Sequence, residues 1–158
     1  MQMPSLFGLL LFIMMNGAFA NHHVLEDVTQ AKEGRLKTKN AHFQQNHRFV
    51  FFFSSTCPHC HNFAPVLKKW ADDNQYAVDA FSFDGKSLPG FSNVLTLDNQ
   101  LLQAAFQNET IRYPALFVVN TQTANLYPVA IGELNFQALH ERMQILVPKI
   151  IDFERGVS

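Results

Sequence analysis

The two cysteines of this chain stand three positions apart, in the segment Cys57-Pro58-His59-Cys60, and its 158 residues contain no other. A Cys-x-x-Cys pair that opens a helix places the first sulfur beside unpaired backbone N–H groups and the positive end of the helix dipole, which stabilise a thiolate. A thiolate attacks disulfides, and a second thiol one turn away can resolve the resulting mixed disulfide. The pattern predicts redox chemistry, with Cys57 as the nucleophile and Cys60 as the resolving thiol.

The two residues between the cysteines suit this role. Pro58 fits a first helical turn, where its missing N–H would have had no partner. His59 can carry a positive charge beside the sulfur, so we expect it to make the Cys57–Cys60 disulfide more strongly oxidising. The preceding run of residues 48–54 is typical of a buried strand. The cysteines are therefore expected on a strand–turn–helix corner.

Two other uses of a cysteine pair fit less well. A structural zinc site usually needs four ligands, and the further candidates are only His59, His61, His22 and His23, without a second cysteine pair. A structural disulfide across four residues closes almost no loop and stabilises little. We expect no metal and no cofactor beyond a redox-active disulfide between Cys57 and Cys60.

The first twenty residues are typical of a secretory signal peptide. An apolar run at 6–15 is too short for a comfortable membrane span, and Ala18 and Ala20 match an A-x-A cleavage pattern. The segment before this run has no Lys or Arg, which departs from the usual pattern. We expect a signal peptide over 1–20, cleavage near Ala20 and a periplasmic protein, with an uncleaved anchor as the alternative.

The remainder is long enough for one domain with its own core. Its 12 basic and 13 acidic residues balance, which argues against a nucleic-acid partner. We divide it into a lead-in over 21–47, a domain over 48–150 and a tail over 151–158. Val24, Val28 and Ala31 have helical spacing, so both a short helix on the domain edge and a loosely ordered lead-in remain open.

The apolar periodicity predicts the element order β-α-β-α-β-β-α. We expect helices over 58–72, from Asp98 to 106, and from Asn135 to a stop at Pro148. Pro65 falls inside the first of these and should kink it. The strands are expected at 48–54, 76–83, 115–120 and 125–131. A strand–helix–strand start requires a parallel pair, and the short late connection allows an antiparallel one, so this is an α/β chain with one mixed sheet between helices.

This order, with Cys-x-x-Cys after the first long strand, resembles the thioredoxin fold. Pro65 stands five positions after Cys60, where thioredoxin-like proteins carry a helix-kinking proline. Pro114 follows Tyr113 before a strand, at the position of the family's cis-proline, and Gly132 precedes the last helix. The resemblance implies that Pro114 is cis and that Tyr113 and Pro114 bind substrate, with the Tyr113 backbone pairing with an extended chain.

Within the fold, Cys-Pro-His-Cys resembles the active site of DsbA-type oxidases, but the chain lacks room for their inserted helical domain and lacks the dimerisation domain of DsbC-type isomerases. It is most similar to the TrbB family of F-type conjugative transfer systems. That resemblance implies formation or reshuffling of disulfides in exported transfer and pilus-assembly proteins, with a membrane redox partner. One departure is Phe51, where thioredoxins have a buried acid that moves protons for the resolving thiol.

Two further functions stay open on the same fold. The chain could be a non-enzymatic assembly factor or holdase that uses apolar surface around Tyr113 and Pro58. It could also be a cytochrome-maturation thiol reductase, a class that is normally membrane-anchored. The activity of a Cys57→Ser variant separates catalysis from binding, and the redox potential separates oxidase, isomerase and reductase.

Overall fold

The computed structural model of this chain describes residues 16–107 and 109–156. The chain divides into two compact units, residues 1–41 and 42–158. The predicted apolar signal run at 6–15 lies outside the described residues, and cleavage near Ala20 stays a prediction. None of the described helices is both long and apolar enough to cross a membrane.

A single helix, α1 (Asn16–Asn46), fills the described part of the first unit and ends inside the second. The lead-in is therefore helical, but the helix is much longer than the short one that we expected on the domain edge. No proline interrupts the chain between Pro4 and Pro58, so nothing stops the helix early. The side chains of residues 26–35 are exposed.

The second unit is built on a four-stranded mixed sheet with the order β2-β1-β3-β4. Strand β1 (His47–Phe53) pairs in parallel with β2 (Val78–Ser82) and antiparallel with β3 (Ala115–Asn120), which pairs antiparallel with β4 (Leu126–Ile131). The predicted strand order and the α/β, thioredoxin-like class are confirmed. The parallel pair follows from the helical crossover between β1 and β2.

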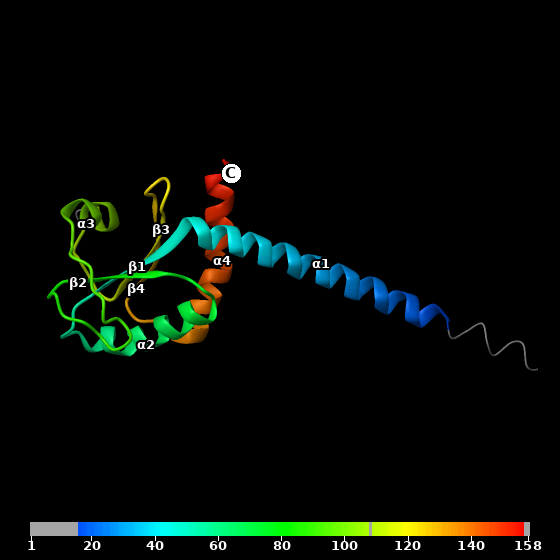
Figure 1. Cartoon of the computed structure of the whole chain (residues 1–158), viewed down its shortest axis with the longest axis horizontal. Helices are drawn as coiled ribbons and strands as arrows, with labels where there is room; N and C mark the ends of the chain where they lie inside the picture. The colour runs from blue at the N-terminus through cyan, green and yellow to red at the C-terminus, as the bar shows by residue number, and fades with distance from the viewer. Residues whose placement is uncertain (1–15, 108, 157–158) are drawn as a thin grey trace, which may run out of the picture. The chain divides into compact units, whose positions relative to one another are not determined.

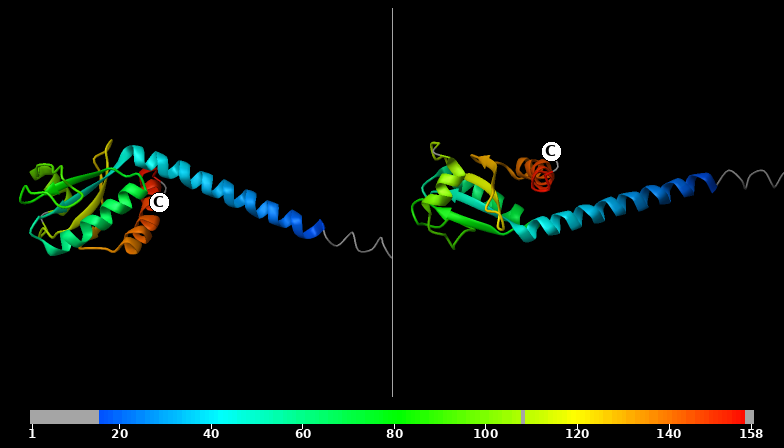
Figure 2. Two further views of the ribbon diagram at one scale, coloured as in Figure 1. Left: turned by 60° about the horizontal axis from the view of Figure 1, so that its bottom comes forward. Right: turned by 90° about the horizontal axis from the view of Figure 1, so that it is seen from above.

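Helices cover both faces of this sheet (Figure 1). Helix α2 (Pro58–Asp73) and helix α4 (Phe136–Glu154) pack side by side on one face, as the left view in Figure 2 shows. Helix α3 (Asn99–Phe106) covers the other face. Asp98 caps α3 through its side chain, as its sequence position predicts, and Asn135, where we expected the last helix to begin, caps α4.

Strand β1 is buried on both of its faces, which explains its run of phenylalanines. Phe49, Phe51 and Phe53 point into the core under α2 and α4, whereas Phe52 packs into the core under α3. Trp70 of α2 meets Phe49 edge to face, with 5.7 Å between ring centroids. The central strand is thereby fixed from both sides.

Pro148 does not end the last helix, so that prediction is wrong. Helix α4 runs through it to Glu154 and into the segment we assigned to a tail. Beyond the proline, Ile150 is buried and Glu154 bonds to residues of other elements. Tertiary contacts therefore outweigh the backbone hydrogen bond that the proline removes. Pro65 lies inside α2, as predicted.

Candidate redox site

Cys57 is the N-cap of α2, and Pro58 is the first residue of the helix. The Cys57 carbonyl accepts hydrogen bonds from Cys60 N at 3.1 Å and His61 N at 3.2 Å, and its sulfur accepts from Cys60 N at 3.3 Å. The first sulfur therefore lies at the start of the helix and accepts a hydrogen bond from a backbone N–H group of the first turn. Cys57 is partly exposed.

Cys60 lies one turn further along α2 and is fully buried in the core. Burial, and then the hydrogen bond with Cys57, raise the pKa of the Cys60 thiol to about 12. The two thiols are therefore unequal, since only the first is open to solvent and the second keeps its proton at neutral pH. Phe51, which stands where thioredoxins have an acid, is also fully buried.

The loop before β3 lies close to Cys57, because β3 is the neighbour of β1 in the sheet. The peptide bond between Tyr113 and Pro114 is cis, as the resemblance implies, and Pro114 is buried. Cys57 Sγ lies 3.9 Å from the Tyr113 carbonyl oxygen. The Tyr113 ring lies against Phe83, with 5.4 Å between centroids, and is 41% exposed. The structure thus brings Cys57, Cys60, Tyr113 and Pro114 together.

His59 is also at the site, but it has a partner that sequence reasoning missed. Its Nδ1 lies 3.2 Å from Oε1 of Glu133, and both side chains are exposed. The hydrogen bonds from His59 and then Asn62 hold the pKa of Glu133 below its usual range. The position of Glu133, directly after Gly132 and before α4, is the sole sequence signal for it. A carboxylate therefore lies beside the histidine that we expect to act on Cys57.

Other candidate ligands do not gather into a metal site. Within 16–107 and 109–156, no group of three or more His, Cys, Asp or Glu side chains is placed to hold a metal ion. His61 instead contacts the carbonyl oxygen of Ser55 through Nε2 at 2.7 Å. The side chains of His22 and His23 are outside the described ones.

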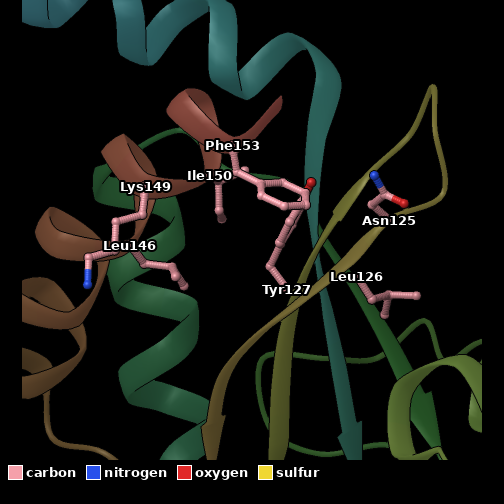
Figure 3. A pocket seen from close by; sticks show the side chains of 7 residues that line it. All are labelled: Asn125, Leu126, Tyr127, Leu146, Lys149, Ile150 and Phe153. Carbon is pink, nitrogen blue, oxygen red and sulfur yellow. The ribbon is translucent and has the colours of Figure 1, made fainter. Parts of the chain in front are cut away.

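An apolar groove of about 460 Å³ lies between β4 and the second half of α4 (Figure 3). The first residues of β4, which line the groove, lie far along the sheet from Ile131, the partner of Ala115 beside the cis-proline. The groove is therefore at the opposite end of the sheet from the cysteines. It is lined by Asn125, Leu126, Tyr127, Leu146, Lys149, Ile150 and Phe153.

A mixed sheet between helices, with a Cys-x-x-Cys helix start facing a cis-proline, defines a protein of the thioredoxin fold. The solved structure of a thiol:disulfide interchange protein of the thioredoxin family from Chlorobium tepidum TLS shares this fold. That likeness has a TM-score of 0.51 and 15% identity, and covers 68% of this chain and 84% of the other. A pneumococcal exposed lipoprotein thioredoxin matches with a TM-score of 0.47 and 15% identity, over 67% of this chain and 89% of its own.

The chain belongs to the TraF family, described as F plasmid transfer operon protein, whose model matches residues 19–144. It is also 32% identical to protein TrbB of Escherichia coli strain K12 over 85 residues. This match covers 54% of the chain and 47% of TrbB, so the chain spans about half the length of that relative. The predicted resemblance to TrbB-like thioredoxin-fold proteins is confirmed.

Proposed function

We propose that this protein is a periplasmic thiol-disulfide oxidoreductase and isomerase that forms or rearranges disulfides in exported proteins. One observation carries the proposal, namely a partly exposed Cys57 at the start of α2, above the buried Cys60 and 3.9 Å from the Tyr113 carbonyl oxygen. This arrangement separates an attacking sulfur from a protected resolving sulfur. It requires no further cofactor, because the disulfide between the two cysteines is itself the redox group.

Oxidation of a substrate begins from the Cys57–Cys60 disulfide. A substrate thiolate attacks the Cys57 sulfur, forms a mixed disulfide and releases Cys60 as a thiolate, which takes up a proton. A second substrate thiolate then attacks the substrate sulfur of that bond, so the substrate disulfide forms and Cys57 leaves as a thiolate. The substrate loses two electrons and the protein gains them, and a disulfide reagent or membrane redox partner must then reoxidise the protein.

Isomerisation starts from the reduced form and needs no net electron transfer. Cys57 attacks a wrong disulfide, and one substrate sulfur is freed while the other stays bonded to Cys57. The freed substrate thiol can attack a different substrate disulfide, and a substrate thiolate finally displaces Cys57. If rearrangement stalls, Cys60 attacks Cys57 and releases the substrate in its reduced form.

Exposed apolar side chains around the cis-proline favour unfolded segments as substrates. Tyr113, Ile111 and Ile131 are all exposed, and the last of these pairs with Ala115 beside the cis-proline. The Tyr113 backbone can pair with an extended chain that brings its cysteine to Cys57. An unfolded protein offers both the extended backbone and the apolar side chains.

The family and the TrbB likeness support a setting in conjugative transfer. We propose cysteine-containing transfer or pilus-assembly proteins as substrates, a membrane redox partner for turnover, and no nucleic-acid partner. Removal of the signal peptide near Ala20 would release the protein into the periplasm. Co-purification of mixed disulfides from cells that carry the transfer genes would identify the substrates.

Refolding of scrambled ribonuclease in a glutathione buffer tests the activity, beside oxidation of the reduced ribonuclease. We expect activity in both assays, with isomerisation the weaker one. Cys57→Ala should abolish both, whereas Cys60→Ala should accumulate covalent complexes. A folded and reducible protein that is inactive in both assays contradicts the proposal and favours the assembly-factor alternative. A strongly reducing potential would instead favour the cytochrome-maturation reductase.

A further inference from the structure

Asp84 lies just beyond the end of β2 and holds the residues that precede Cys57. Its carboxylate accepts hydrogen bonds from Ser55 Oγ at 2.6 Å, Ser55 N at 3.0 Å and Ser54 Oγ at 3.2 Å. It also accepts from Ser82 Oγ at 2.7 Å and Lys86 N at 3.4 Å. Asp84 thus joins the end of β2 to residues 54–56, which we call the entry loop.

The entry loop is bonded in turn to the redox helix. Cys57 N donates to Ser54 O at 3.2 Å, and His61 Nε2 lies 2.7 Å from Ser55 O. Within the loop, Ser54 Oγ contacts Thr56 Oγ1 at 3.0 Å. The Asp84 carboxylate is therefore held at a defined place against the loop that leads directly into Cys57, although it is open to solvent.

The same hydrogen bonds keep this carboxylate charged. The bonds from the side chains of Ser55 and Ser82 hold the pKa of Asp84 far below its usual range. Its charge is the smallest of the causes that raise the pKa of Cys60, after burial, the bond with Cys57 and the charge of Cys57. An acid held so firmly in its ionised form is a poor acceptor for a proton from Cys60. Asp84 therefore does not replace the acid that is absent at Phe51.

We propose that Asp84 is a positioning residue whose fixed charge slows the attack of Cys60 on the mixed disulfide, which gives a substrate more time to rearrange. This inference rests on the proposed exchange at Cys57. In the release step Cys60 loses its proton to solvent, and its thiolate then attacks the Cys57 sulfur and forms the Cys57–Cys60 bond. The substrate sulfur leaves with the electron pair of its broken bond and takes up a proton. A nearby negative charge opposes formation of the Cys60 thiolate.

The uncharged disulfide 4,4′-dithiodipyridine measures this step directly in the reduced full-length protein. Attack by Cys57 releases a first equivalent of coloured thiopyridone and leaves a mixed disulfide on Cys57. Attack by Cys60 releases the second equivalent, so the second phase reports the rate of resolution. A Cys60→Ala control should release the first equivalent alone.

The decisive variant is Asp84→Asn, which keeps an oxygen acceptor for the serines and removes the charge. We expect its second phase at pH 7 to be about three to ten times faster, as a fall of roughly half to one pKa unit at Cys60 implies. High salt should shrink this difference, because it screens the charge in the unmodified protein. The matched control is Asp79→Asn, which removes an acid on the same strand that bonds to Arg48 at 2.6 and 2.7 Å and should leave the rate unchanged.

Ser55→Ala supplies a second test that does not depend on the folding of Asp84→Asn. It removes the shortest bond to the carboxylate and frees it to turn toward solvent, so resolution should also quicken, by a smaller factor. If neither variant resolves the mixed disulfide faster than the unmodified protein, the inference is overturned and the proposed function stays intact. Equal acceleration by Asp79→Asn overturns it as well. If the unmodified protein forms no mixed disulfide with the probe, both proposals fail.

Discussion

At the scale of single residues, we expect His59 and its partner Glu133 to act together on Cys57. The two side chains are 3.2 Å apart, and the hydrogen bond from His59 holds the pKa of Glu133 below its usual range. A histidine inside Cys-x-x-Cys favours the thiolate and hence the reduced protein, which makes the disulfide more oxidising. We expect Glu133 to reduce that effect, so that the redox potential depends on both residues.

We expect His59→Ala to make the protein more reducing. Loss of the positive charge should lower the equilibrium constant for oxidation of glutathione about threefold to tenfold, or roughly 15–30 mV for a two-electron couple. Equilibration of the variant in glutathione buffers of known ratio measures this shift. An unchanged or more oxidising potential would show that His59 does not act on the thiolate.

Glu133→Gln should shift the potential in the opposite direction. It removes a negative charge near the thiolate and leaves His59 in place, so the protein should become more oxidising by a few-fold in the same equilibrium constant. Glu141→Gln is the matched control, because Glu141 is an exposed acid on α4 whose bond is to Gln137. A shift of the same size in the control would contradict a local role for Glu133.

The unequal burial of the two thiols predicts a strict order of alkylation. Cys57 is partly exposed, whereas Cys60 is fully buried and its pKa is raised to about 12. Iodoacetamide at mildly acidic pH should therefore modify Cys57 first in the reduced protein, faster than Cys60 on the order of a hundredfold or more. Peptide mapping by mass spectrometry identifies the labelled residue, and early labelling of Cys60 would reverse the assigned roles.

At the scale of elements, a polar cluster fixes the last turn of α4 to the sheet. Glu154 accepts hydrogen bonds from Asn120 Nδ2 at 2.8 Å and Tyr127 OH at 2.9 Å, and it lies 3.0 Å from Nε2 of the buried His47. Burial acts to raise the pKa of Glu154, but these three hydrogen bonds together lower it. The cluster joins α4 to β1, β3 and β4 and explains how the helix continues beyond Pro148.

Glu154→Gln should destabilise the protein in a pH-dependent way. Since the folded-state pKa of Glu154 is depressed, its charge stabilises the fold above the unfolded pKa of about 4.3, and this contribution is lost as the pH falls further. We expect a loss of about 1–2 kcal/mol at pH 7 and a smaller difference below pH 4. Urea unfolding at both values measures it. An equal difference at the two pH values would contradict a role for the charge.

At the scale of the whole domain, two cores lie back to back across the central strand. Phe52 anchors the smaller core, where its ring meets Phe106 at 5.3 Å and Phe117 at 5.8 Å between centroids. The larger core, under α2 and α4, contains Cys60. Because β1 packs in both cores, we expect a loss of packing in the smaller core to weaken β1 and with it the support of α2, which carries the cysteines.

Phe52→Ala should lower the free energy of unfolding by about 3–5 kcal/mol, because it leaves a cavity among rings held by strands on either side. Denaturant unfolding of the reduced protein gives the difference. Phe153→Ala is the matched control, since Phe153 is 69% exposed, and it should cost much less. A similar loss in both variants would contradict the importance of the smaller core.

The sequence by itself determined the element order and the cysteine pair, because these depend on local features. These local features affect only residues a few positions away. They are the buried run of β1, the helix starts at Asp98 and Asn135, and Pro58 beside Cys57. The extension of α4 past Pro148 depends on contacts with β1, β3 and β4, so local helix rules failed there. The meeting of Glu133 with His59 and of Asp84 with Ser55 likewise depended on tertiary structure. These residues are far apart in sequence, and only strand register and turn geometry bring their side chains within hydrogen-bonding distance.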